Sequence, residues 1–430
     1  MNQLTLPESL WRQTATPAPP PRALSGLVMA DVAIIGAGYT GLSAALRAIE
    51  LGLKPIVLEA SEVGYGASGR NGGVVSTKYR VSLSDMARSH GVQTAKRMNQ
   101  LGHDAMDRVG RYVQEHGIAA GLAETGNLRC AHNAHVLAAL ATEVETVRTT
   151  FGDTSLRMLD AHETAAETGS DGFVGGVLNS HAGVIHPLDY ARGLAQAVRK
   201  GGGEIFENTL VKGTLTDPAG IEVTAAQGSV RAERLVISTN GYSDLSGATA
   251  GVRQTVIPFR SAMVATEPLP AATFATLIPN SRSYSETRRM MRWFRRIDDR
   301  LLFGGRGAFG KADSAPAFTA LERAMKAIFP QIASVAVTHR WSGLVAMTMD
   351  SLPQIGLANA RTAFSLGYNG TGIAMASLLG RHAVDLVMGE TVDLALMRRA
   401  QPKSIPFYFL REPAVRTVAG WYQFLDRIGR

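Results

Sequence analysis

The first residues whose types and spacing could do chemistry are three glycines near the N-terminus. Gly36, Gly38 and Gly41 form a G-x-G-x-x-G pattern between an apolar run at 31–36 and a stretch of helical spacing at 39–51. Such glycines allow a tight turn, let a pyrophosphate approach the backbone and let helix and strand pack closely. The start of the helix offers unpaired N–H groups and a partial positive charge to phosphates. The spacing therefore predicts a bound dinucleotide.

An acidic residue ends the same strand-helix-strand unit. The second apolar run, 55–58, is followed by Glu59, whose carboxylate can accept hydrogen bonds from both hydroxyls of a ribose. A carboxylate at this place would repel the 2′-phosphate of NADP, so the pattern disfavours that cofactor. The choice between NAD and FAD stays open at this point.

A second glycine-rich loop follows directly, where a plain NAD-binding domain continues into a helix and a further strand. It reads Gly66-Ala67-Ser68-Gly69-Arg70-Asn71-Gly72-Gly73, and an apolar pair at 74–75 continues as a strand. The backbone of such a loop could follow the rest of an extended cofactor, and Arg70 and Asn71 are suited to polar contacts. A solvent-exposed linker is the alternative interpretation.

The composition is that of an ordinary globular chain. Of 430 residues, 45% are hydrophobic and 19% charged, and this composition excludes disorder and fibrous repeats. The net charge is +8. The single cysteine, Cys130, excludes an internal disulfide and any multi-cysteine zinc or iron-sulfur site, so no metal is expected. No run approaches the roughly 18 apolar residues of a membrane span, and the start has no secretion leader. We therefore expect no membrane span and a cytoplasmic location.

Elements of two kinds alternate along the chain. Nucleotide-fold units are expected at about 31–80, 186–245 and 340–390, with helical or antiparallel segments between them. Helical spacing covers 85–117, 135–151, 187–200, 319–329 and 373–388. Strands are expected over 204–206, 209–215, 221–225, 235–239, 252–266, 288–297, 301–304 and 363–367. This alternation predicts interleaved rather than consecutive domains.

Several motifs in order along the chain carry a family resemblance. They are GAGYTG and LEA, the loop GYGASGRNGG, HPLDY at 186–190, LVISTNGYS at 235–243, RWSGLVAMTMDSLPQIG at 340–356 and GYNGTGIAMAS at 367–377. Together they resemble the D-amino-acid-oxidase and glycine-oxidase superfamily of flavoproteins, and most closely the branch with gamma-glutamylputrescine oxidase and L-pipecolate oxidase. The resemblance extends from Trp11 to about Gly389.

The resemblance implies an α/β plus α+β fold, in which a Rossmann-like FAD-binding domain is interleaved with an antiparallel-sheet substrate domain. A proline-rich arm would occupy residues 1–30. The FAD-binding domain would be assembled from 31–85, 165–250 and 335–430, and the substrate domain from 86–164 and 251–334.

The resemblance also implies where FAD is held. The backbone around Val211 would meet the adenine, the turn at 238–241 would pass near the pyrophosphate, and the helix start at 370–372 would lie at the flavin pyrimidine. The expected cofactor residues are Gly36, Ala37, Gly38, Tyr39, Thr40, Gly41, Glu59, Ala60, Ser68, Gly69, Arg70, Asn71, Gly72, Gly73, Val211, Thr239, Asn240, Gly241, Gly370, Thr371 and Gly372. Some relatives bind flavin covalently through cysteine or histidine, but no histidine precedes His90 and Cys130 falls in a substrate-domain segment. Non-covalent FAD is therefore expected.

The implied reaction is oxidation of a C–N bond in a small amine or amino acid. Hydride would pass from the carbon beside the nitrogen to flavin N5, water would hydrolyse the imine, and oxygen or another acceptor would take the electrons. No paired carboxylate, His/Asp dyad or nucleophile motif stands out, so no catalytic base is assigned. Oxidase and dehydrogenase remain alternatives.

The best candidates for substrate contacts lie in an arginine-rich segment. If 288–297 is a strand, then Arg289, Met291, Trp293, Arg295 and Ile297 share one face. Arg295 could pair with a substrate carboxylate while Trp293 forms a pocket wall. The further pocket candidates are His339, Trp341, Tyr368 and Asn369. A solvated basic face and a structural histidine are the alternatives.

Two other functions remain open. The arginines between Arg282 and Arg306 could meet phosphates of RNA in a flavin-dependent RNA-modifying oxidoreductase. However, no RNA-binding module or lysine-rich tail is present, so no nucleic-acid partner is expected. FAD could also stabilise a protein that has no turnover.

Overall fold

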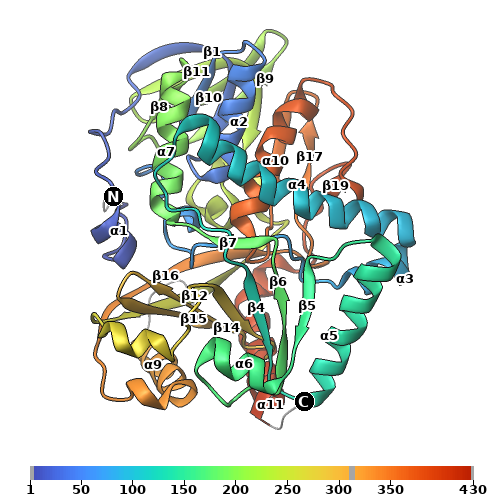
Figure 1. Cartoon of the computed structure of the whole chain (residues 1–430). Helices are drawn as coiled ribbons and strands as arrows, with labels where there is room; N and C mark the ends of the chain where they lie inside the picture. The colour runs from blue at the N-terminus through green and yellow to red at the C-terminus, as the bar shows by residue number, and fades with distance from the viewer. Residues whose placement is uncertain (1–3, 309–314, 428–430) are drawn as a thin grey trace.

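Two large sheets, each with its own helices, form the protein (Figure 1). The structure is a computed structural model and describes residues 4–308 and 315–427. The first sheet, at the top of Figure 1, is mainly parallel, and the second, below it, is mainly antiparallel. The mixed α/β and α+β fold class is therefore confirmed.

The first sheet is built outward from the expected strand-helix-strand unit. Its nine strands are β1 (Gly26–Ile35), β2 (Pro55–Leu58), β8 (Glu204–Phe206), β9 (Gly213–Asp217), β10 (Gly220–Thr224), β11 (Gly228–Ile237), β17 (Gln354–Asn359), β18 (Thr362–Leu366) and β19 (Arg398–Arg399). The order is β19-β17-β18-β11-β1-β2-β8, and β10 and β9 extend from β11. Strands β18, β11, β1, β2 and β8 run parallel. Their carboxyl ends therefore meet at one edge of the sheet.

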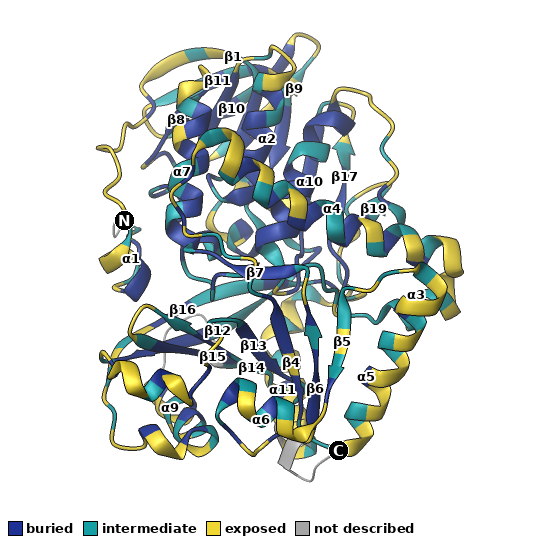
Figure 2. Cartoon of the chain, in the orientation of Figure 1, coloured by how far each residue is buried: buried dark blue, intermediate teal, exposed yellow. Residues whose placement is uncertain are grey.

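Four helices lie over one face of this sheet. They are α2 (Tyr39–Glu50), α4 (Val92–His116), α7 (Pro187–Lys200) and α10 (Gly372–Val387). Helices α2, α7 and α10 contact its strands, and α4 packs on α7 and α10. Apolar residues of these four helices belong to one buried core, and buried residues are dark blue in Figure 2. Small residues let α2 and α10 approach closely, because a Cβ at Gly380 would overlap the carbonyl oxygen of Thr40. The two helix starts that border the site are thereby fixed relative to each other.

The second sheet has the order β16-β12-β15-β14-β13-β4-β6-β5. Its strands are β4 (Asn127–Ala131), β5 (Leu156–Leu159), β6 (Gly175–Asn179), β12 (Ile257–Thr266), β13 (Ser283–Glu286), β14 (Arg292–Ile297), β15 (Arg300–Ala308) and β16 (Val337–Met347). Helices α5 (Ala134–Thr146), α6 (Ala161–Thr168) and α9 (Ala315–Ile328) accompany it. A separate core that includes Phe294, Phe303 and Phe329 lies between this sheet and α9.

The remaining elements connect and border the two sheets. They are α1 (Leu10–Thr14), α3 (Leu83–His90), α8 (Ala250–Arg253), α11 (Arg411–Arg427) and a small sheet of β3 (Val74–Ser76) and β7 (Ala182–Val184). No helix within residues 4–308 and 315–427 is both long and apolar enough to cross a membrane.

Some element boundaries differ from the sequence-based expectation. The helix expected over 85–117 is two helices, because Gly91 adopts φ +86° between α3 and α4. The strand expected over 252–266 begins at Ile257, because the short helix α8 precedes it. The strand expected over 288–297 begins at Arg292. Apolar content predicted these segments correctly, but not the turns that precede them.

Three elements lie elsewhere than the expected division of the chain suggests. Strands β6 and β16 pair within the second sheet, although 165–250 and 335–430 were expected to belong to the nucleotide-binding part. Helix α4 packs on α10 and shares the core of the first half, although 86–164 was expected in the other part. An amphipathic helix or a short strand does not reveal in its own sequence which sheet it joins.

The contact between Gly41 and Gly36 gives a test of the strand-helix unit. A Cβ at Gly41 would overlap the carbonyl oxygen of Gly36, so Gly41→Ala is expected to cost about 2 to 3 kcal/mol of unfolding free energy through overpacking. Gly251→Ala in α8 is the matched control, because a Cβ there meets nothing within 4 Å. Thermal unfolding followed by circular dichroism should show a lower Tm for Gly41→Ala alone, and an equal Tm for both variants would contradict this close packing.

Candidate functional site

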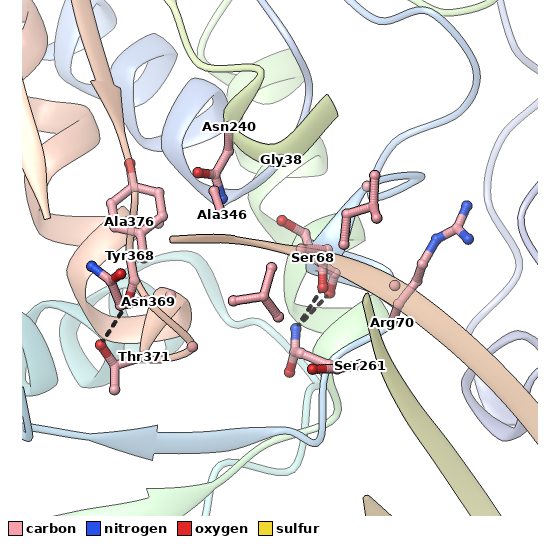
Figure 3. A pocket seen from close by; sticks show the side chains of 18 of the residues that line it. Gly38, Ser68, Arg70, Asn240, Ser261, Ala346, Tyr368, Asn369, Thr371 and Ala376 are labelled. Atoms are coloured by element: carbon pink, nitrogen blue, oxygen red, sulfur yellow. Dashed lines mark hydrogen bonds between the residues drawn. The ribbon is translucent and has the colours of Figure 1, made fainter. Parts of the chain in front are cut away.

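One cavity lies between the carboxyl edge of the first sheet and one face of the second sheet (Figure 3). Gly36, Glu59 and Ser238 line it, and each of them directly follows a parallel strand. Ligands of open α/β sheets bind outside the carboxyl ends of the strands, because loops and helix starts meet there. The topology alone therefore makes this cavity the candidate site.

The start of α2 forms one wall of the cavity. Gly36 adopts φ +107°, which favours glycine, and Gly38 caps the helix without a side-chain hydrogen bond. A Cβ at Gly38 would lie 2.9 Å from Ser68 Oγ, so a larger residue would crowd the second glycine loop. Gly38, Tyr39 and Thr40 all line the cavity. The helix start thus offers its main chain and its positive end to an anion.

Glu59 lies at the end of β2, almost completely buried with 7% of its surface exposed. Its carboxylate accepts hydrogen bonds from Ala37 N (2.8 Å) and Ser61 N (3.1 Å). Burial raises the pKa of Glu59 to about 7, and the main-chain N–H groups oppose this rise. A carboxylate keeps further acceptor positions beyond two hydrogen bonds, which suits the hydroxyls of a ribose.

The second glycine loop is folded tightly rather than exposed as a linker. Tyr39 N donates to Ser68 Oγ (3.1 Å), and the Tyr39 hydroxyl, with its one proton, lies 2.6 Å from the carbonyl oxygen of Ser68 and 2.9 Å from that of Pro187. Asn71 Nδ2 donates to the Ser68 carbonyl (3.1 Å), and Asn71 Oδ1 accepts from Gly73 N (2.8 Å). The loop is therefore ordered by its own polar side chains.

Two tryptophans fix the same loop from outside. Trp11 of α1 is fully buried, and its Nε1 donates to the carbonyl oxygen of Asn71 (2.8 Å). Trp341 of β16 donates from Nε1 to the carbonyl oxygen of Arg70 (2.9 Å). The two rings contact edge to face with centroids 6.1 Å apart. The N-terminal segment thus reaches the site, where the sequence suggested only an extended arm.

Arg295 is placed differently from the expectation that it contacts substrate. It is 7% exposed and does not line the cavity. Its Nη1 donates to the carbonyl oxygens of Gly73 (2.7 Å) and Ile185 (3.1 Å), and burial lowers its pKa to about 10. Arg295 therefore joins the second sheet to the glycine loop, and it is a structural residue.

His339 and Trp341 also lie outside the cavity lining. His339 Nε2 contacts Gln13 Oε1 at 2.6 Å, and its Nδ1 contacts Thr338 Oγ1 at 2.9 Å. Trp341 is fully buried behind the glycine loop. The expectation that both residues belong to a substrate pocket is corrected, because their strand directs them toward the N-terminal segment.

Tyr368 and Asn369, by contrast, lie at the cavity beside the start of α10 (Figure 3). The Tyr368 hydroxyl contacts Thr40 Oγ1 at 2.7 Å and so links the starts of α10 and α2. Asn369 adopts φ +55°, and its Oδ1 accepts from Thr348 N (3.0 Å). Gly370 follows with φ +98°, and α10 begins without a side-chain cap. A second uncapped helix start therefore faces the cavity.

The lining residues divide the expected cofactor set. The expected residues that line the cavity are Gly36, Gly38, Tyr39, Thr40, Glu59, Ala60, Ser68, Arg70, Asn71, Gly72, Val211, Thr239, Asn240, Gly370, Thr371 and Gly372. Those that do not line it are Ala37, Gly41, Gly69, Gly73 and Gly241. The second group includes glycines that allow close packing, since a Cβ at Gly73 would overlap the carbonyl oxygen of Ile185.

Strand register determines which side chains of the second sheet reach the cavity. Met263, Gly304, Trp293, Ser285 and Arg129 lie opposite one another on β12, β15, β14, β13 and β4. A Cβ at Gly304 would overlap the Trp293 ring, so this glycine gives the indole its space. Trp293 Nε1 lies 3.1 Å from Met263 Sδ. Trp293 therefore forms part of the wall opposite the first sheet.

The structure also places charged residues at the cavity that the sequence did not identify. They are Lys78, Arg80, Arg129 and Glu286, together with Arg306, which was noted only as part of an arginine-rich segment. No local motif joins them, because they come from β4, β13, β15 and the segment after β3. The only local sequence signal for this cluster is the spacing of Lys78 and Arg80, two residues apart after β3. Many solvent-exposed strands have charged residues at the same spacing.

The bonds of Arg295 to the glycine loop predict a measurable stability effect. Arg295→Gln is expected to lose about 2 to 3 kcal/mol, because two buried carbonyl oxygens lose a charged donor. Arg296→Gln on the same strand is the control, since its Nε donates to the carbonyl of Asp298 in the adjoining turn. Thermal unfolding and limited proteolysis of the loop should distinguish the two. Equal effects would contradict a role for Arg295 in holding the loop.

The chain is similar to known oxidoreductases in sequence and in fold. The chain is 30% identical over 408 residues to a probable oxidoreductase OrdL of Haemophilus influenzae, with 94% of each chain covered. It is 29% identical over 429 residues to gamma-glutamylputrescine oxidoreductase of Escherichia coli, with 98% of each covered. Glycine oxidase from Geobacillus kaustophilus shares the fold, with a TM-score of 0.73 and 22% identity over 85% of this chain and 96% of that one.

A family profile matches most of the chain. It is described as FAD dependent oxidoreductase (DAO) and covers residues 31–386. This range includes both glycine motifs, Glu59 and the start of α10, which are the segments that border the cavity. The chain belongs to the DAO family of FAD-dependent oxidoreductases and is an amine or amino-acid oxidoreductase.

Proposed function

We propose that FAD binds along the carboxyl edge of the first sheet. The start of α2 would hold the pyrophosphate, Glu59 the ribose, and the main chain at Val211 the adenine. The start of α10 would stabilise negative charge at the flavin pyrimidine, because a helix N-terminus carries a partial positive charge. Two uncapped helix starts and a buried carboxylate on one cavity support this placement.

Non-covalent binding of FAD agrees with the surroundings of the cavity. Cys130 is completely buried in the core of the second half, does not line the cavity, and burial raises the pKa of its thiol. No histidine lines the cavity within the part of the chain that the structure describes. We therefore propose that denaturation releases the flavin unmodified.

The proposed reaction is oxidation of the C–N bond of a small amine that carries a carboxylate. The candidate substrates are gamma-glutamylputrescine-like compounds and cyclic or secondary amino acids such as L-pipecolate. The carbon beside nitrogen loses hydride as the nitrogen lone pair forms the imine. Water then adds to give a carbonyl group and a free amine, which separate for an open-chain substrate and stay on one molecule for a cyclic one. FAD supplies the two-electron acceptor, and oxygen or another acceptor takes the electrons from it.

The residues of this chain would bind and orient the substrate and favour its neutral amine. Lys78, Arg80, Arg129 and Arg306 supply positive charge for a carboxylate at the substrate end of the cavity. The same charge would lower the pKa of a bound ammonium group, because like charges disfavour its protonated form. The indole of Trp293 would exclude water on one side. One cavity that joins the two helix starts to this cationic end is the observation that carries the proposal.

The structure does not favour the alternative of an RNA-modifying enzyme. Arg282 pairs with Glu167 at 3.1 Å, and Arg288 and Arg292 both pair with the buried Glu286. Arginines engaged in this way are less available for phosphates than a free basic surface. The arginine-rich segment of the sequence is therefore largely used within the fold.

A reduction assay tests the proposed reaction directly. Mixing the purified holoenzyme anaerobically with gamma-glutamylputrescine, L-pipecolate, sarcosine, proline or D-amino acids should bleach the flavin absorbance with at least one of them. Rapid recovery of colour with peroxide on admission of air would identify an oxidase, and slow recovery a dehydrogenase. Absence of bleaching by every amine, carboxylated or not, would overturn the proposal.

The raised pKa of Glu59 predicts a pH dependence of FAD binding. The charged carboxylate accepts both ribose hydroxyls, so affinity of the apoprotein should increase as pH rises through about 7. Glu59→Gln should bind FAD about tenfold more weakly above that pH and lose the pH dependence. Titration with FAD, followed by flavin fluorescence, measures both effects. Glu222→Gln on β10, outside the cavity, is the control, and an unchanged affinity of Glu59→Gln would exclude the ribose contact.

A further inference from the structure

Four cationic side chains from separate segments meet at the part of the cavity that Glu286 lines, next to Arg289 and to Arg288, which pairs with Glu286. Lys78 and Arg80 follow β3, Arg129 lies on β4 and Arg306 on β15, and all four line the cavity. Arg129 lies in the row of mutually opposite residues that contains Trp293 and Gly304. Arg306 is two residues beyond Gly304 on β15, opposite Ser261, and so belongs to the next row on the same face. The positive charges thus occupy two rows of the wall and the segment that faces it.

These charges act on one another. Burial lowers the pKa of Lys78 to about 7, and the charges of Arg129, Arg306 and Arg80 add to the effect. Burial likewise lowers the pKa of Arg306 to about 9, with a further contribution from Arg80. Like charges that depress one another's protonation are unfavourable in the free protein. An anion in this end of the cavity would remove that cost.

The protein itself does not supply that anion among the residues described. Within residues 4–308 and 315–427 none of the four cations has a carboxylate within ion-pair distance. Glu286 lines the same end, but Arg288 Nη1 lies 2.5 Å and Arg292 Nε 3.5 Å from its carboxylate. Glu143 acts on Arg129 from further away and accepts from Leu83 N.

We infer that the substrate is a dianion, an amine that carries two carboxylates. This inference rests on the proposed C–N oxidation and narrows its substrate to dicarboxylates, which excludes gamma-glutamylputrescine and L-pipecolate because each has one carboxylate. One carboxylate is satisfied by a single arginine or by an arginine and a lysine, so one acidic group would leave two of the four cations uncompensated. In a substrate with two carboxylates, each carboxylate would have two of the four cations as partners. The cations on two rows of the sheet separate the two partners in space.

The test compares ligands that differ by one carboxylate. Sarcosine and iminodiacetate are secondary amines that differ in this way, and alanine and aspartate form a second pair. Propionate and succinate extend the comparison to anions without an amine. Dissociation constants are read from the perturbed spectrum of the oxidised flavin in the holoenzyme. We expect the dicarboxylate of each pair to bind about tenfold more tightly or better, and to lose this advantage at high salt.

Variants then locate the preference. Arg129→Gln and Arg306→Gln should each reduce the ratio of dicarboxylate to monocarboxylate affinity by about tenfold. Lys78→Met is the third variant, for use if an arginine variant does not retain flavin, and the flavin absorbance reports folding. Arg148→Gln is the matched control, because Arg148 is exposed, pairs with Glu145 and does not line the cavity. It should leave the ratio unchanged.

The outcomes separate the inference from the proposed function. Equal affinities within all three ligand pairs, or tighter binding of ligands with additional positive charge, would overturn the dianion. Flavin reduction by sarcosine as efficient as by iminodiacetate would preserve the proposed reaction and reject the inference. Tight binding of succinate that Arg129→Gln abolishes, together with no reduction by any amine, would preserve the anion site and reject the proposed reaction.

Discussion

Three side chains from distant parts of the chain donate hydrogen bonds to the main chain of residues 70–73, and the arrangement of the cavity depends on these contacts. Trp11 reaches Asn71, Trp341 reaches Arg70 and Arg295 reaches the carbonyl of residue 73. Loss of a hydrogen-bond donor to a buried carbonyl oxygen is unfavourable, so docking of all three segments stabilises the loop. The contacts therefore couple the N-terminal segment, the second sheet and the loop between them.

This coupling explains why the two sheets form one site. The first sheet supplies helix starts, and the second supplies a flat wall of alternating side chains, but neither encloses a ligand alone. The loop lies between them, and Gly73 leaves no room for a Cβ against the carbonyl of Ile185. This close fit holds the loop against the segment that follows β7.

The two sheets bring different charges to the cavity. Glu59, with a pKa raised by burial, follows β2 of the first sheet, while Arg129 and Arg306 come from β4 and β15 of the second and act on Lys78. Helix starts add positive potential along the first sheet. Such a field orients any ligand that has an anionic group and a cationic or neutral one, before specific contacts form. Orientation and charge together define what chemistry the cavity can support.

The sequence by itself determined the strand-turn-helix at Gly36 and Gly38, the acidic Glu59 and the second glycine loop, because neighbours along the chain decide these features. It also supported FAD through the family resemblance. Only the tertiary structure decided that Arg295 holds the loop and that Arg129 and other cations line the cavity. The physical reason is that a strand exposes two faces, and the register with distant strands decides what each face meets.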